Sequence, residues 1–160
     1  MAKKVKVKKT LVQQILTKVG INHTGIQINA LEGEMPQGYE KSQIFKTLAL
    51  LGDKTGPIIG ILPITEHLSE KKLAKISGNK KVSMIPQKDL EKTTGYIHGA
   101  NNPVGIRQKH NYPIFIDQTA LQLNEMIVSA GEVGHSIIIN PQDLASFVKA
   151  EFADILEASN

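Results

Sequence analysis

A lysine within an apolar run is the first residue of this 160-residue chain whose position indicates a chemical role. Lys46 lies in the run 44–51, and strand alternation places it on the same face as Ile44 and Leu48. An ammonium group on such a face can bind a phosphate or a carboxylate within a cleft. It can also extend to solvent from a sheet edge or form a buried ion pair, and spacing alone favours these structural alternatives.

The stretch 95–105 is the second candidate for chemistry, because it combines glycine, asparagine and proline. Glycine allows close backbone approach, and Pro103 fixes a turn while the neighbouring N–H groups stay free. Backbone N–H groups in such a loop can bind an anion or a developing oxyanion. Because long loops are often rich in Gly and Asn, an ordinary connection explains the same composition.

The chain offers little for nucleophilic or metal-dependent catalysis. It contains no cysteine, which excludes disulfides, Cys-ligated zinc and thiol nucleophiles. Its five histidines lack the i, i+4 spacing of helical zinc ligands, and Ser129 lacks the Gly-x-Ser-x-Gly turn of a hydrolase. Asp117 ends an apolar segment, where its carboxylate can orient a substrate or cap the turn at Thr119.

The charge of the chain is unevenly distributed. The net charge is +4, and residues 1–116 hold 18 of the 19 basic residues, whereas residues 117–160 hold seven acidic ones. This asymmetry indicates a surface that faces a polyanion, although solvated lysines on ordinary helices would give the same count. No segment approaches 20 consecutive apolar residues, and polar residues interrupt the N-terminal stretch where a signal peptide would lie. We therefore expect a cytoplasmic protein without membrane contact.

The elements that position these residues are short, and the length suggests one domain over residues 1–160. Residues 1–9 carry five lysines and are expected to fray or to form an edge segment. The patterns predict strands at 21–29, 44–51, 57–62, 82–85, 114–117, 126–129 and 136–139. They predict helices after Thr10, Ser69, Pro86 and Asn140, the last with an apolar stripe reaching Ile155, and loops at 32–40 and 93–105. This arrangement favours an α/β fold with a mixed sheet or half-barrel flanked by helices.

Taken in order, these residues resemble the YbaK/EbsC family. The motifs that carry the resemblance are 43–48, Thr94-Gly95-Tyr96, Gly99-x-x-x-Pro103-x-Gly105, Ile116-Asp117, 128–134, Asp143-Leu144 and 152–155. Each motif is weak alone, but the ordered set is specific and spans the chain from Gln43 to Ile155. Two positions depart from the family pattern. Residues 134–136 contain no carboxylate, and residues 23–26 contain no tyrosine, and both are expected to border the pocket.

Members of this family are freestanding aminoacyl-tRNA deacylases, similar to the editing domain inserted in bacterial prolyl-tRNA synthetases, and the resemblance implies the same activity for this chain. It implies a single α/β domain on a mixed, barrel-like sheet that cleaves the ester between a wrong amino acid and the tRNA 3′-terminal adenosine. The substrate that the resemblance implies is cysteine esterified to proline tRNA. The thiol of that cysteine attacks its own ester, so no cofactor and no nucleophilic side chain are needed. The partner is the 3′ end of a mischarged tRNA, with prolyl-tRNA synthetase as a further candidate, and we expect a monomer.

The resemblance also assigns roles to single residues. It implies that Lys46 holds the terminal phosphate or the substrate, and that the backbone of Gly99 and Ala100 stabilises the carbonyl oxygen. The residues expected to contact the substrate are Phe45, Thr47, Tyr96, Asn101, Pro103, Asp117, Ser129 and Gly131. The alternative is a non-catalytic module that binds tRNA or a nucleotide in the same cleft.

Overall fold

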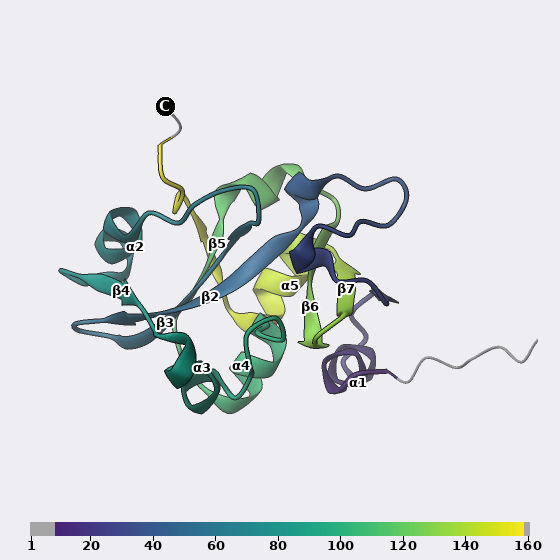
Figure 1. The fold of residues 1–160 in the computed structure, drawn as a ribbon, viewed down its shortest axis with the longest axis horizontal. Helices are drawn as coiled ribbons and strands as arrows, with labels where there is room; N and C mark the ends of the chain where they lie inside the picture. Colours follow the sequence, from purple (N-terminus) through teal and green to yellow (C-terminus); the bar gives the residue numbers. More distant parts are fainter. Residues whose placement is uncertain (1–8, 159–160) are drawn as a thin grey trace, which may run out of the picture.

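Two β-sheets and five α-helices make up residues 9–158, the part of the chain that the computed structural model describes (Figure 1). The larger sheet has five strands in the order β4-β2-β3-β5-β8. Its strands are β2 (Phe45–Gly52), β3 (Gly56–Pro63), β4 (Val82–Met84), β5 (Ile114–Asp117) and β8 (Glu151–Ala153). β2 pairs antiparallel with β3 and β4, whereas β5 pairs parallel with β3 and β8, so the predicted mixed sheet is confirmed.

The smaller sheet is antiparallel and has the order β1-β7-β6. It consists of β1 (His23–Ile26), β6 (Met126–Glu132) and β7 (His135–Ile139). An isolated parallel bridge between Ile44 and Ile127 is where it touches the larger sheet. Beyond this bridge, β2 pairs with β3 and β4 and not with β6. The two sheets therefore stay separate, and no closed barrel forms within residues 9–158. The expected barrel-like sheet is therefore corrected to two adjoining open sheets.

The α-helices are α1 (Leu11–Lys18), α2 (Glu70–Ser77), α3 (Gln87–Thr94), α4 (Pro103–Lys109) and α5 (Pro141–Val148). Short 3₁₀ turns lie at η1 (Ala30–Glu32), η2 (Lys41–Gln43) and η3 (Gln118–Gln122). Three caps expected from sequence are confirmed, because the side chains of Thr10, Ser69 and Asn140 accept hydrogen bonds from backbone N–H groups of the first turn. No helix in residues 9–158 combines the length and apolar character needed to cross a bilayer.

Helix α4 differs from the expectation, because the sequence patterns predict a loop over the whole segment 93–105. The side chain of Asn102 accepts a hydrogen bond from the backbone N–H of Gly105, and Pro103 occupies the first helical position. Both are start signals for a helix, but the surrounding glycines and asparagines favoured a loop. The loop proper is therefore limited to residues 95–102.

The last helix is shorter than predicted. It ends at Val148, because Lys149 adopts a left-handed backbone with φ +57°. Phe152, expected on the helix, lies in β8 and pairs with Ile116. The basic segment 1–9 lies outside the described residues except for Lys9, which is exposed.

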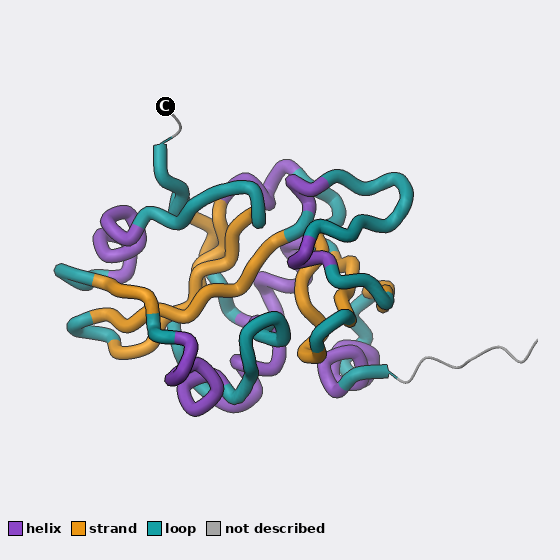
Figure 2. Tube along the Cα trace, viewed as in Figure 1, coloured by secondary structure: helices purple, strands orange, loops and turns teal. Residues whose placement is uncertain are grey.

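Both faces of the larger sheet are covered, as Figures 1 and 2 show. Ile59 and Ile61 of β3 belong to the main core, which extends to α4, α5 and the smaller sheet. Ile58 and Leu62 alternate with them and pack toward α2 in a second cluster. β2 is an inner strand, but the edge that it turns to β4 is partly open, because β4 pairs only with Leu50–Gly52 and ends there.

Candidate active site

A cavity of about 450 Å³ opens at the edge of β2 that β4 leaves unpaired. Four consecutive residues of β2, Lys46–Ala49, line it, so both faces of the strand reach it at this edge. Its other polar lining residues are Gln87, His98, Gly99 and Asn101. Its apolar wall includes Ile64, Met84, Ile85 and Leu90. The size lies within the range of small-molecule sites, and polar groups face an apolar wall as in such sites.

Lys46 brings a cation to this cavity. Its side chain is half-buried, and burial lowers the pKa of its ammonium group below the usual value, an effect that the negative charge of Glu66 partly offsets. Among residues 9–158, no carboxylate lies within ion-pair distance of its Nζ. The buried ion pair that the sequence left open is thus not formed by the described residues. The ammonium group is available to an anionic ligand.

The loop 95–102 forms the opposite side of the cavity. Gly99 adopts φ +90°, a left-handed conformation that favours glycine. Within residues 9–158, no hydrogen bond is found from the backbone N–H of His98, Gly99 or Asn101. Such N–H groups can stabilise a developing oxyanion if they point to it. Ala100 differs, because it is buried and its N–H donates to the carbonyl oxygen of Ile97 over 3.0 Å, so the expected catalytic role of that N–H has no support here.

Thr47 and Asn101 connect the two sides. Asn101 Nδ2 donates a hydrogen bond to the main-chain oxygen of Thr47 over 3.2 Å. This contact occupies a position on β2 that a neighbouring strand would otherwise take. Asn101 Oδ1 and Thr47 Oγ1 are buried, and neither has a hydrogen-bond partner among the described residues. Buried polar atoms are rarely left in this state, which points to a ligand.

Several residues expected at the substrate support the loop instead. Ser129 Oγ donates to the carbonyl oxygen of Gly99 at 3.5 Å and accepts from the N–H of Gly131. Tyr96 packs over Gly105, with the ammonium group of Lys109 4.7 Å from its ring centre. These side chains do not line the cavity, and they hold the backbone that does.

Phe45 and Pro103 are also displaced from the expected role. Phe45 is 1% exposed and belongs to the main core, because alternation along β2 turns it away from the face of Lys46. Pro103 is buried in the first turn of α4. Neither lines the cavity.

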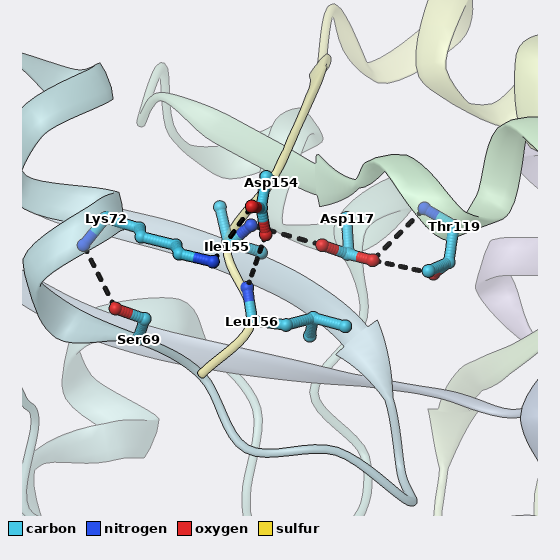
Figure 3. Close-up of polar contacts among 7 residues, drawn as sticks. All are labelled: Ser69, Lys72, Asp117, Thr119, Asp154, Ile155 and Leu156. Atoms are coloured by element: carbon cyan, nitrogen blue, oxygen red, sulfur yellow. Dashed lines mark hydrogen bonds and ion pairs between the residues drawn. The ribbon is translucent and has the colours of Figure 1, made fainter. Parts of the chain in front are cut away.

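Asp117 is a structural carboxylate in this fold, as Figure 3 shows. It has no exposed surface, and its Oδ2 accepts from both the N–H and the hydroxyl of Thr119. Its Oδ1 accepts from the N–H of Ile155 at 3.1 Å. Of the two roles that the sequence allowed, the structure shows the cap, extended by a tie to the C-terminal segment. Nearby, Lys72 and Asp154 form an exposed ion pair of 2.8 Å.

The sequence did not single out some of the lining residues. Met84, Ile85 and Gln87 reach the cavity because β4 ends early and the chain turns into α3, which no local pattern reveals. His98 lies within the loop that the sequence marked, but no role was assigned to it. No group of three potential metal ligands among His, Cys, Asp and Glu gathers anywhere in residues 9–158.

The two segments that depart from the family pattern, residues 23–26 and 134–136, do not line the cavity of Lys46. Ile26 pairs with Ser136 across β1 and β7, and Gly25 and His135 line a separate cavity of about 280 Å³ together with Gln13. Both departures lie on the smaller sheet and its connecting turn, so the structure does not place them with Lys46.

The sequence profile of the aminoacyl-tRNA editing domain matches residues 30–147, which include Lys46 and the entire loop. The chain belongs to the aminoacyl-tRNA editing domain family. A relative with a proposed activity, the Cys-tRNA(Pro)/Cys-tRNA(Cys) deacylase EbsC of Enterococcus faecalis, is 46% identical over 118 residues, which cover 74% of this chain and 71% of EbsC. The proline–tRNA ligase of Limosilactobacillus fermentum is 28% identical over 105 residues, or 63% of this chain and 18% of the ligase.

Solved structures show the same fold for this member of the aminoacyl-tRNA editing domain family. A protein described as a candidate trans-editing enzyme for prolyl-tRNA synthetase superimposes with a TM-score of 0.78 at 23% identity, covering 92% of this chain and 95% of that one. The protein APE2540 gives a TM-score of 0.81 at 20% identity, covering 91% and 99%. The predicted family is thus confirmed by sequence, and these solved structures share the α/β fold of the chain.

Proposed function

We propose that this protein is a trans-editing deacylase that removes a wrong amino acid from tRNA, with Cys-tRNA(Pro) or Cys-tRNA(Cys) as the substrate. The identity to EbsC over most of both chains supports the choice of substrate. The observation that carries the proposal is that the Lys46 ammonium and the Gly99 backbone line one cavity. A cation for phosphate and N–H groups for a carbonyl oxygen are what an ester at the end of a tRNA requires.

The chemistry proceeds within the substrate. The thiol sulfur of the esterified cysteine bonds to its own carbonyl carbon, the bond from that carbon to the ribose oxygen breaks, and the ribose oxygen leaves with the thiol proton. The chain contributes position and charge stabilisation, since no cysteine is present in it. Loss of one oxyanion donor costs on the order of 100- to 1000-fold in rate, so the loop N–H groups can supply much of the effect.

Deacylation of charged tRNA tests this function. Wild-type protein is assayed on proline tRNA charged with Cys, Ala, Ser or Pro, and we expect Cys-tRNA(Pro) to be cleaved fastest. Lys46→Met retains the aliphatic stem and removes the charge, and should lower kcat/KM by about 10- to 100-fold. Lys75→Ala, at an exposed position of α2, is the matched control and should behave as wild type. Unfolding midpoints of both variants confirm that they fold.

Two results would count against the proposal. Wild-type-like deacylation by a folded Lys46→Met variant removes the role of the cation. Binding of charged tRNA without cleavage of any ester favours the alternative, a non-catalytic binding module in the same cleft. A partner synthetase is proposed only as an addition, and it is tested by repeating the assay with prolyl-tRNA synthetase present.

A further inference from the structure

Asn101 is held in one orientation within the cavity. The residue is 6% exposed, and its Nδ2 donates to the carbonyl oxygen of Thr47. A main-chain carbonyl can only accept, so the nitrogen of the amide must face it and the oxygen must face away. Asn101 Oδ1 is therefore an acceptor whose direction is fixed by the fold.

This acceptor has no donor within the described residues. The hydroxyl of Thr47, a residue that is 9% exposed, is buried and likewise has no hydrogen-bond partner there. Both residues line the cavity of Lys46. A buried acceptor without a donor retains the cost of its desolvation until a ligand supplies one. The cavity thus requires a hydrogen-bond donor on its ligand, close to the loop that carries Gly99.

The donor is identified by what an aminoacyl ester carries beside its carbonyl group. The α-ammonium group is attached to the carbon next to the carbonyl, has three N–H donors and forms charge-assisted hydrogen bonds. No Asp or Glu is among the residues that line the cavity, so an ammonium group has no carboxylate to bind there. Asn101 Oδ1 lies two residues along the loop from Gly99, whose backbone is proposed to hold the carbonyl oxygen.

We propose that Asn101 Oδ1, assisted by the Thr47 hydroxyl, binds the α-ammonium group of the esterified amino acid, so that N-acylated esters such as peptidyl-tRNA are rejected. This inference rests on the proposed deacylase function and adds to it a positional requirement. An acylated nitrogen has lost its charge and two of its three donors, and it carries a group that must fit elsewhere.

The test compares Cys-tRNA(Pro) with N-acetyl-Cys-tRNA(Pro). Both keep the thiol and the ester, so the cyclisation is available to each. For wild type, acetylation should lower kcat/KM by about 10- to 100-fold, the worth of a hydrogen bond to a charged group. Asn101→Leu removes the acceptor without adding room. It should lower cleavage of Cys-tRNA(Pro) by a similar factor and bring the ratio between the two substrates close to one.

Two further variants separate binding of the amine from support of the loop. Thr47→Val keeps the shape of the side chain and the backbone oxygen that Asn101 contacts, so it should lower the ratio with the loop intact. Gln87→Ala, on the α3 side of the cavity, should change both substrates equally and leave the ratio as in wild type. A displaced loop would likewise slow both substrates equally.

The outcomes distinguish this inference from the proposed function. Equal cleavage of both substrates by wild type overturns the role of the amine while the deacylase stands. The role of the amine is also overturned if Asn101→Leu still prefers Cys-tRNA(Pro) to the acetylated substrate as strongly as wild type does. The size of the acetyl group, and not the loss of a donor to Asn101, would then explain the preference. A third outcome concerns a tRNA whose terminal adenosine lacks the 2′-hydroxyl. If the effect of Asn101→Leu disappears on this tRNA and does not depend on acetylation, the acceptor binds the ribose, and the role of the amine is overturned as well. If wild type cleaves no Cys-tRNA at all, both proposals fail.

Discussion

Asn101 and Thr47 are 54 positions apart in the chain, yet the amide of one donates to the main-chain oxygen of the other over 3.2 Å. The contact extends the hydrogen bonding of β2 beyond the point where β4 ends. It therefore fixes the loop to the strand that carries Lys46. The cation and the loop backbone share one rigid frame, which a deacylase that relies on position requires.

Burial of Lys46 makes substrate binding sensitive to pH at the alkaline side. Desolvation lowers the pKa of its ammonium group, and Glu66 partly opposes this. The charged form exists below that pKa, so the binding of the tRNA phosphate that we propose for Lys46 should be complete at lower pH and be lost as pH rises through it. We expect KM for charged tRNA to rise at a lower pH than an ordinary lysine would give. Rapid assays from neutral to alkaline pH, corrected for spontaneous ester hydrolysis, measure this.

Two variants check the assignment of this titration. Lys46→Arg keeps the charge at every pH of the assay and should remove the alkaline rise in KM. Glu66→Gln removes the opposing charge and should move the rise to lower pH. An unchanged profile in Lys46→Arg would assign the titration to another group.

Local signals in the sequence were sufficient for most elements. Thr10 and Asn140 combine a cap with a following apolar pattern, and both helices begin where expected. The end of α5 was missed because Phe152 continues the helical spacing of apolar residues, although it lies in β8. Pairing with β5, a strand far along the chain, decides its conformation, and no local pattern contains that information.

The candidate site was predictable only in part. Lys46 is conspicuous because a charge interrupts an apolar run, and Gly99 because it lies in a stretch that combines glycine, asparagine and proline. The contact between Asn101 and Thr47 depends on the length of β4, and so does the wall at Met84. Tertiary distances of this kind arise from the packing of whole elements, so sequence spacing could not supply them.

The backbone of Gly99 should matter for rate more than for stability. Gly99→Ala forces a side chain into φ +90°, with the new Cβ about 3.4 Å from the side chain of Val133. A left-handed alanine costs roughly 1–2 kcal/mol, so the loop should shift to relieve it. We expect kcat to fall at least about tenfold as the N–H groups move from the carbonyl oxygen. Single-turnover deacylation and thermal unfolding measure the two effects.

Gly38→Ala is the matched control for that substitution. Gly38 has φ +92° with no atom near its Cβ position, and it does not line the cavity. The same backbone strain should lower the unfolding midpoint by a comparable amount and leave kcat unchanged. Equal losses of kcat in the two variants would show that strain alone, rather than the position of the Gly99 backbone, explains the effect.

Asp117 should affect stability and not chemistry. Asp117→Ala leaves the buried N–H of Ile155 without its acceptor, which costs about 1–3 kcal/mol. It also removes the cap of the turn at the exposed residue Thr119, which costs about 1 kcal/mol more. We expect a drop of several kcal/mol in the free energy of unfolding, measured by urea titration, with wild-type kcat/KM per folded molecule. Asp154→Ala removes the exposed ion pair with Lys72 in the same segment and should cost no more than about 1 kcal/mol. A fall in kcat/KM of the folded Asp117→Ala fraction would instead place this carboxylate at the substrate.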